Sequence, residues 1–143
     1  MNDPVEILLV DDNPSDAELT LHVLSRHFAG RIADSTKVVH DGAEALDFIF
    51  CTGAYSGRDP RNPPKMMLLD LKLPKVDGLE VLRRAKADPR TRDIPIVVFS
   101  SSWEDRDLKQ ARELGAHSYV VKPVDFTQFV EAVRTALALA NAL

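Results

Sequence analysis

Residues 5–12 read VEILLVDD, a nearly unbroken apolar run that ends in the two carboxylates Asp11 and Asp12. A continuous apolar run of this length is typical of a strand buried on both faces, as in a parallel sheet. Asn13 and Pro14 follow, and these residue types are favoured at a helix N-cap and at the first helical position. The stretch therefore predicts a buried strand, an acidic pair at its end, and a helix.

The order of strand, polar residue and helix recurs along the rest of the chain. Further apolar or β-branched runs predict strands over residues 36–40, 66–69, 94–99 and 119–121. Strict alternation of strands and helices indicates a parallel sheet with helices on both faces. We therefore expect an α/β fold of the flavodoxin-like (βα)5 type, a doubly wound five-stranded parallel sheet with strand order 2-1-3-4-5.

The segments between the strands have apolar residues at three- and four-residue spacing, which is typical of helices with one buried face. The predicted boundary residues of these helices are Gly30, Asp41, Asp77, Ser102, Gly115 and Asp125. The first helix is expected to bury Ala17, Leu21, Leu24 and Phe28. The last is expected to bury Phe126, Phe129, Val130, Val133, Leu137 and Ala140. Residues 52–65 carry three prolines and two glycines and predict a long loop.

Length and composition are those of one soluble domain. The chain has 143 residues, so we predict a single domain over residues 1–143. The net charge is 18 − 22 = −4, which argues against a nucleic-acid footprint. Cys51 is the single cysteine, so no intramolecular disulfide is expected and a reducing compartment is the default. The chain has no signal-peptide pattern and no apolar run near the ~20 residues of a membrane span, so we expect a cytoplasmic protein.

Polar side chains stand at the ends of four predicted strands. Asp11 and Asp12 end the first, and Asp70, Ser100 and Lys122 end the third, fourth and fifth. Because the carboxyl ends of parallel strands meet at one edge of a sheet, we expect these groups to lie together. Three converging carboxylates repel one another and must either take up protons or hold a cation. An all-oxygen site with few protein ligands suits Mg²⁺, or Mn²⁺ in its place.

These groups would form a phosphoryl-transfer pocket. Asp12 and Asp70 would bind the metal directly with the backbone carbonyl of Lys72, and Asp11 would act mainly through a metal-bound water. Asp70 would be the nucleophile, since carboxylates form aspartyl-phosphates. Mg²⁺ and the Lys122 ammonium would neutralise charge on the phosphoryl oxygens. The Ser100 hydroxyl could donate a hydrogen bond to one of these oxygens.

Each of these residues alone has an ordinary structural explanation. A lone aspartate after a strand is usually a turn former or a helix cap. A serine before a helix is more often a cap than a phosphate ligand, which is our prediction for Ser102. Only the combination at the ends of four strands favours the pocket.

The chain resembles the receiver domain of bacterial two-component response regulators. The matching stretches are ILLVDD at 7–12, LLDLKLPKVDG at 68–78, IPIVVFSS at 94–101 and GAHSYVVKP at 115–123. The resemblance implies transfer of a phosphoryl group from a phosphohistidine of a sensor histidine kinase to Asp70, which becomes the 4-aspartylphosphate. It also implies switch roles for Ser100 and Tyr119 and a cis Lys122–Pro123 peptide bond. Because the chain ends with the fifth predicted helix, we expect a stand-alone receiver without an output domain.

The resemblance also bears on partners. The loop at 51–65, the LPKVDG stretch and the three serines at 100–102 are similar to small receivers that partner phytochrome-type histidine kinases. A phosphorelay shuttle that passes phosphate to a histidine phosphotransfer protein, a phosphate sink, and a phosphorylation-independent binding module are the alternatives. A phosphohydrolase is disfavoured, because such enzymes usually carry a second aspartate where this chain has Lys72. We therefore expect that the protein is not an enzyme, and that it catalyses only its own phosphorylation and dephosphorylation.

The last predicted helix carries a second apolar stripe, which consists of Ala132, Ala136, Leu139 and Leu143. A solvated helix face is normally polar, so a stripe beside the core-facing one needs a partner surface. One hypothesis is that this stripe forms a homodimer seam together with the helix predicted after Ser102. An alanine-rich, fraying C-terminus is the alternative explanation.

Overall fold

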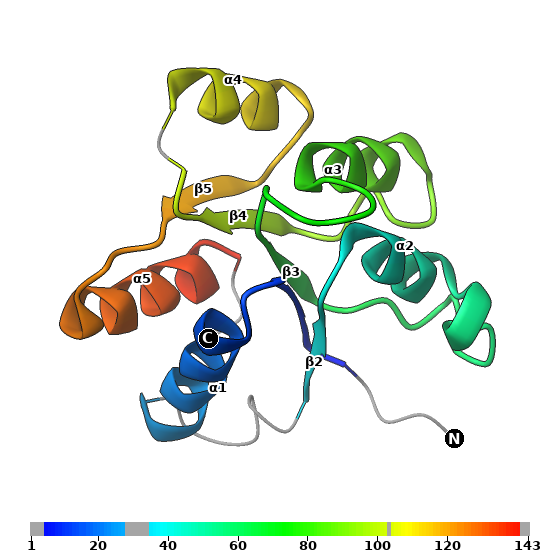
Figure 1. Cartoon of the computed structure of the whole chain (residues 1–143). Coiled ribbons are helices and arrows are strands. Elements are labelled where there is room, and N and C mark those ends of the chain that lie inside the picture. The colour runs from blue at the N-terminus through cyan, green and yellow to red at the C-terminus, as the bar shows by residue number, and fades with distance from the viewer. Residues whose placement is uncertain (1–4, 28–34, 103, 141–143) are drawn as a thin grey trace.

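The structure is a computed structural model, and it describes residues 5–27, 35–102 and 104–140. Within these residues one five-stranded sheet is present, and every neighbouring pair of strands is parallel. The strand order is β2-β1-β3-β4-β5, which confirms the predicted order (Figure 1). The strands are β1 (Ile7–Val10), β2 (Thr36–Val39), β3 (Met66–Leu69), β4 (Ile96–Ser100) and β5 (Ser118–Val121).

Helices cover both faces of the sheet. Helices α1 and α5 lie on one face, and α2, α3 and α4 lie on the other (Figure 1). The helices are α1 (Pro14–His27), α2 (Gly42–Phe50), α3 (Gly78–Ala87), α4 (Asp105–Glu113) and α5 (Phe126–Leu139). The predicted long loop includes a short 3₁₀-helix, η1 (Gly53–Tyr55). No helix among the described residues is both long and apolar enough to span a membrane.

The central strands are buried on both faces. In β1, Leu8 and Val10 belong to the core beneath α2 and α3, whereas Ile7 and Leu9 belong to the core beneath α1 and α5. All residues of β1, β3 and β4 are buried. Because side chains on both faces of these strands are buried, polar and apolar residues do not alternate along them. The sequence therefore shows continuous apolar runs.

Local signals set several helix ends as predicted. The side chains of Asp41, Asp77 and Asp125 accept hydrogen bonds from backbone N–H groups in the first turns of α2, α3 and α5. Gly115 follows α4 with φ of +97°, the left-handed conformation that glycine adopts after a helix. The predicted boundary residue Gly30 and the predicted core residue Phe28 lie outside the described residues.

Several sequence predictions are wrong in detail. Helix α1 buries Val23 rather than Leu21. Phe126, the first residue of α5, is 48% exposed rather than buried. Ser102 does not cap α4, since the helix begins three residues later, and its buried hydroxyl donates instead to Asp107 Oδ2 at 2.5 Å. The described residues include no cis peptide bond, so Lys122–Pro123 has the trans form that X–Pro bonds usually favour.

The loop between β3 and α3 packs closely against the start of α2. The Gly42 N–H donates to the Pro74 carbonyl at 3.3 Å. A Cβ atom added at Gly42 would lie 1.7 Å from the Val76 carbonyl oxygen, and one added at Gly78 would lie 2.3 Å from the Asp70 carbonyl oxygen. These two glycines therefore allow the backbone contacts that hold the loop beside the end of β3.

Candidate functional site

The ammonium of Lys122 lies among carboxylates at the carboxyl edge of the sheet. Its Nζ is 2.7 Å from Asp11 Oδ2, 3.0 Å from Asp70 Oδ2 and 3.2 Å from Asp16 Oδ2. The Lys122 side chain is 5% exposed, and that of Asp11 is 1% exposed. The structure thus brings together residues separated by more than a hundred positions in the sequence, because they follow β1, β3 and β5.

Asp70 is contacted by donors from three parts of the chain. Ser100 donates its hydroxyl to Asp70 Oδ1 at 3.0 Å, and the backbone N–H of Lys72 donates to the same oxygen at 3.2 Å. Lys122 donates to the other oxygen. Among the described carboxylates, Asp70 combines a buried position with contacts to both an ammonium and a hydroxyl. Its role as the nucleophile stays a prediction.

The donor set suits a hard divalent cation. Carboxylate oxygens of Asp11, Asp12 and Asp70 all lie within 4.8 Å of one another, and Asp12 is exposed. Oxygen ligands of this kind match Mg²⁺ or Mn²⁺, and an exposed ligand leaves room for waters on the ion. The residues present therefore fit such an ion. The part predicted for the Lys72 carbonyl stays a prediction.

Charge in the site is unbalanced. Three carboxylates, those of Asp11, Asp16 and Asp70, contact the Lys122 ammonium, and the Asp12 carboxylate lies near those of Asp11 and Asp70. Burial lowers the pKa of Lys122, but hydrogen bonds and attraction from Asp11 and Asp70 outweigh it and raise this pKa above its usual range. Burial raises the pKa of the Asp11 carboxyl, against the hydrogen bond and charge of Lys122. The ammonium stays charged, and the excess negative charge is what a divalent cation would offset.

A chain of contacts leads from Asp70 to Tyr119. Ser100 Oγ, which donates to Asp70, accepts the Ser102 N–H at 3.4 Å, a long contact. The carbonyl of Ser102 in turn accepts the Tyr119 hydroxyl at 2.8 Å. Burial raises the pKa of the half-buried Tyr119 phenol. The two predicted switch residues, Ser100 and Tyr119, are therefore linked through the segment between β4 and α4.

Asp16 is the site residue that the sequence analysis missed. It lies in the first turn of α1, where an acidic residue usually favours the helix dipole and has no further role. The prediction of Asn13 as the N-cap contained a usable signal for Asp16. It places the first turn of α1, which includes Asp16, directly after Asp11 and Asp12 and so beside the edge that carries them.

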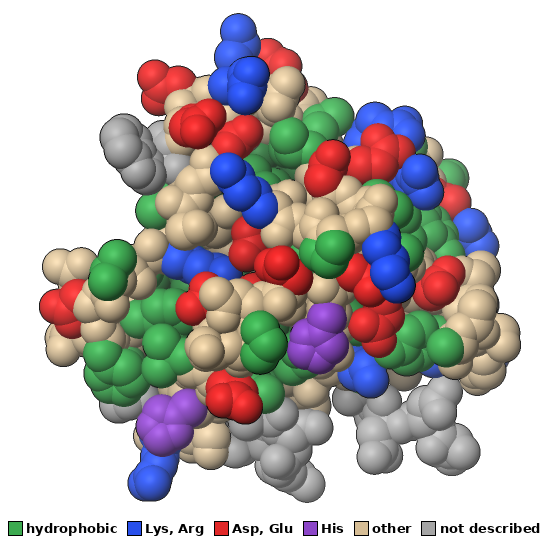
Figure 2. All heavy atoms as spheres, viewed as in Figure 1, with side chains coloured by type: hydrophobic (Ala, Val, Ile, Leu, Met, Phe, Trp, Pro, Cys, Tyr) green, Lys and Arg blue, Asp and Glu red, His purple; other side chains and the backbone are tan. Residues whose placement is uncertain are grey.

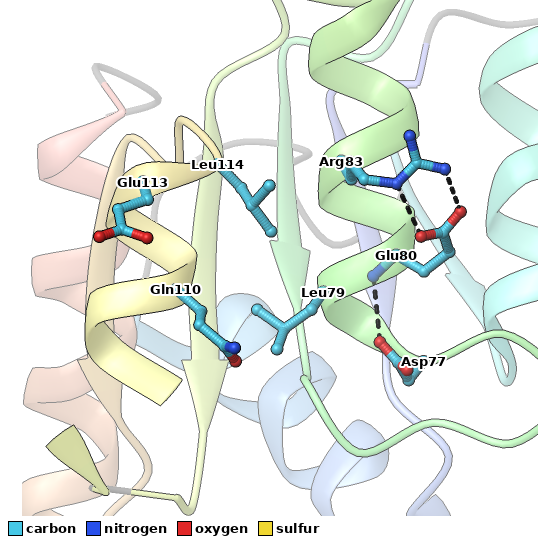
Figure 3. A pocket seen from close by; sticks show the side chains of 7 residues that line it. All are labelled: Asp77, Leu79, Glu80, Arg83, Gln110, Glu113 and Leu114. Atoms are coloured by element: carbon cyan, nitrogen blue, oxygen red, sulfur yellow. Dashed lines mark hydrogen bonds and ion pairs between the residues drawn. The ribbon is translucent and has the colours of Figure 1, made fainter. Parts of the chain in front are cut away.

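The remaining surface offers weaker candidates. On the face seen in Figure 2, acidic and basic side chains are interspersed over α3 and α4, so no patch of one sign forms there. A groove between α3 and α4 has Leu79 and Leu114 beside it, and Arg83 at its edge is paired with Glu80 (Figure 3). This groove holds no buried titratable group, whereas the carboxyl edge holds three.

The premise of the homodimer seam is only partly met. Ala136 is 0% exposed and Ala132 packs partly against the core, so these residues face the sheet of their own chain. Leu139 is 41% exposed, and Leu143 lies outside the described residues. The stripe predicted as a seam is therefore largely a continuation of the core-facing stripe of α5.

Comparison with known proteins identifies the family. A model of the response regulator receiver domain matches residues 7–134, most of the chain. The protein therefore belongs to the response regulator receiver domain family. Receiver domains of response regulators are signalling modules rather than classical enzymes, they partner sensor histidine kinases, and they bind a divalent metal ion.

Three relatives are similar over nearly the whole fold. Response regulator Rcp1 of Synechocystis sp. is 37% identical, over 85% of this chain and 78% of Rcp1. The crystal structure of the Mn²⁺-bound form of response regulator Rcp1 is 31% identical with a TM-score of 0.80, over 94% of this chain and 93% of that chain. The phosphorylated cyanobacterial phytochrome response regulator RcpA is 31% identical with a TM-score of 0.86, over 98% of this chain and 96% of RcpA. The bacteriophytochrome response regulator AtBRR is 46% identical with a TM-score of 0.75, over 96% and 95% of the two chains.

Proposed function

We propose that this protein is a response regulator that accepts a phosphoryl group on Asp70 from a sensor histidine kinase and changes conformation to signal to a partner. One observation carries the proposal. The two oxygens of the Asp70 carboxylate are contacted by the Lys122 ammonium at 3.0 Å and the Ser100 hydroxyl at 3.0 Å. A nucleophile held between a cation and a hydroxyl has the groups needed for a transferred phosphoryl group already in place.

In the proposed transfer, one Asp70 oxygen attacks phosphorus. The phosphorus–nitrogen bond of the phosphohistidine breaks as the new phosphorus–oxygen bond forms, and the imidazole leaves with the electron pair. Lys122 would donate to a phosphoryl oxygen, and Ser100 would donate to another. A divalent cation held by Asp11, Asp12 and Asp70 would supply positive charge that offsets the charge on the phosphoryl oxygens.

The proposed conformational change uses the contacts beyond Asp70. A Ser100 hydroxyl that follows the phosphoryl group would alter its contact with the Ser102 N–H, and the Ser102 carbonyl accepts the Tyr119 hydroxyl. The two states would differ in these contacts, and phosphorylation would bias their populations.

The proposed kinase is of the phytochrome type. Support comes from the 46% identity to the bacteriophytochrome response regulator AtBRR and the likeness to RcpA.

A histidine phosphotransfer protein and a homodimer through α4 and α5 stay predictions. Light scattering of wild type and Leu139→Arg, with and without phosphorylation, tests the dimer, because Leu139 is the exposed apolar residue of the stripe among the described ones.

Intact mass after incubation with Mg²⁺ and acetyl phosphate tests the proposed function. Wild type is expected to gain one phosphoryl group, and Asp70→Asn is expected to gain none while keeping its fold. Uptake by Asp70→Asn at the normal rate would show that the acceptor is a different residue. Absence of uptake by folded wild type, with acetyl phosphate and with a phytochrome-type kinase, would contradict the proposal.

A further inference from the structure

The Lys122 ammonium has acceptors that differ strongly in exposure. An ammonium has three N–H donors. The three carboxylate oxygens within 3.2 Å of Nζ belong to Asp11, Asp70 and Asp16. The side chains of Asp11 and Asp70 are 1% and 11% exposed, and that of Asp16 is 36% exposed. All three donors are thus engaged, and the contact with Asp16 is both the longest and the most exposed.

The backbone of α1 holds Asp16 in this position. The N–H of Asp16 donates to the Asn13 side chain at 3.1 Å. The carbonyl of Asp16 accepts the hydroxyl of Thr20 at 2.9 Å, and Thr20 is fully buried. Because both backbone groups of Asp16 are bonded within the first turn of the helix, its carboxylate stays within reach of Lys122.

We propose that Asp16 is a positioning residue, which occupies one N–H donor of Lys122 until an oxygen of the phosphoryl group on Asp70 replaces it. This inference rests on the proposed function. The phosphoryl group leaves Asp70 with one free oxygen, through which Asp70 would keep its contact with Lys122. A phosphoryl oxygen then needs a further donor from Lys122, so either Asp11 or Asp16 must give way. Release of Asp16 costs the least, because its exposed carboxylate regains water, whereas Asp11 would be left buried without its partner.

In this proposal the Asp16 carboxylate and the phosphoryl group compete for the same N–H donor of Lys122. The site contains four carboxylates and one ammonium, so it resists the arrival of another anion. Neutralising Asp16 removes both the competition for Lys122 and one nearby negative charge. Both effects have the same sign, and they favour the phosphorylated state over the free state.

Calorimetric titration with beryllofluoride, a mimic of the phosphoryl group, in the presence of Mg²⁺ tests this role on the full chain. Asp16→Asn and Asp16→Ala are each expected to bind beryllofluoride about two- to fivefold more tightly than wild type, the range for one partly exposed ion pair. Glu18→Gln is the matched control, because Glu18 is an exposed acidic residue on the same helix. It is expected to bind as wild type does.

The outcomes separate this inference from the proposed function. Wild type that binds no beryllofluoride would contradict the proposed function itself. Wild type that binds, with Asp16→Asn and Asp16→Ala equal to or weaker than Glu18→Gln, would overturn the role of Asp16 alone. Unfolding midpoints of the same variants without beryllofluoride provide the second readout. A merely structural role would shift these midpoints and leave the affinities unchanged.

Discussion

The Ser100 hydroxyl and the Asp70 carboxylate form a 3.0 Å hydrogen bond between two buried side chains at the ends of neighbouring strands. Leu69 of β3 pairs with Val98 of β4, so Asp70 comes one residue after this pair and Ser100, the last residue of β4, comes two residues after it. The position of this bond is therefore set by strand register rather than by a loop. This bond connects Asp70 to the start of the segment that leads to α4.

Ser100→Ala removes this hydrogen bond without changing the backbone. The free energy of unfolding is expected to fall by about 1 kcal/mol, because a buried carboxylate oxygen loses a donor. Phosphoryl uptake should persist, whereas NMR shift changes in α4 and β5 on addition of beryllofluoride should shrink. Ser101→Ala, at an exposed neighbour, is the control for urea unfolding and NMR. Full-sized shift changes in Ser100→Ala would contradict the role of this hydroxyl.

Lys122→Ala leaves buried carboxylates without their ammonium. Removing one partner of a buried ion pair typically costs about 3–5 kcal/mol, so a loss of this order is expected in urea unfolding without divalent cations. Mg²⁺ should restore part of the loss, because it would replace the missing positive charge. The stabilisation by Mg²⁺ is therefore expected to be larger in Lys122→Ala than in wild type.

Lys65→Ala is the control for this prediction. Lys65 pairs with Glu6 at 3.2 Å, but its side chain is 71% exposed, so its removal should cost less than about 1 kcal/mol. Equal losses in the two variants, or a smaller Mg²⁺ effect in Lys122→Ala, would show that the buried ammonium does not compensate the carboxylates.

Gly42→Ala tests the close contact between α2 and the loop before α3. The added Cβ would lie 1.7 Å from the Val76 carbonyl oxygen, and a backbone atom cannot rotate away. A destabilisation of about 2 kcal/mol or more is expected, measured by urea unfolding. A Cβ added at Gly57 meets nothing within 4 Å, so Gly57→Ala should change stability by less than about 0.5 kcal/mol. Similar stabilities of the two variants would refute the contact.

Low pH should weaken the ion pairs that Glu80 forms with Arg83 and Arg84 on α3. Hydrogen bonds from Arg83 and then Arg84 lower the pKa of the half-buried Glu80 carboxyl from 4.5 to about 2 (Figure 3 draws Arg83 and Glu80). A carboxyl with a lowered folded pKa stabilises the fold above its unfolded pKa, and this contribution is lost as pH falls through the folded value. The stability difference between wild type and Glu80→Gln should therefore shrink between pH 4.5 and pH 2.

Unfolding in urea at several pH values measures this difference. Glu113→Gln serves as the control for the loss of one acidic charge, since Glu113 is exposed across the same groove. A difference between wild type and Glu80→Gln that does not depend on pH would contradict the ion-pair explanation.

The sheet and the central site were predictable because both follow from strong, repeated signals. Continuous apolar runs determine which segments are strands, and parallel alternation then places Asp11, Asp70, Ser100 and Lys122 at one edge. The closeness of Asp70 to Ser100 follows from the neighbouring positions of β3 and β4 in the sheet.

Details that depend on tertiary placement were not predictable in the same way. Asp16 looked like an ordinary first-turn acid, and its pairing with Lys122 depends on how α1 leaves β1. Serine is a residue type that often caps helices, but α4 begins three residues after Ser102. The Ser102 hydroxyl donates to the Asp107 side chain instead. Phe126 fits an apolar stripe, but it is the first residue of α5 and is exposed, so periodicity alone assigned it wrongly to the core.

Helix α4 is the most weakly anchored helix on its face of the sheet. Of its nine residues only Ala111 is buried, and hollows lie on both sides, one towards α3 and one towards β5. Elements with few buried contacts open locally at a small fraction of the global unfolding free energy. Amide hydrogens of α4 should therefore exchange with solvent while those of β1, β3 and β4 stay protected. The contacts that begin at Asp70 and pass through Ser100 and Ser102 thus end at α4, the helix on this face whose conformation should cost the least free energy to change.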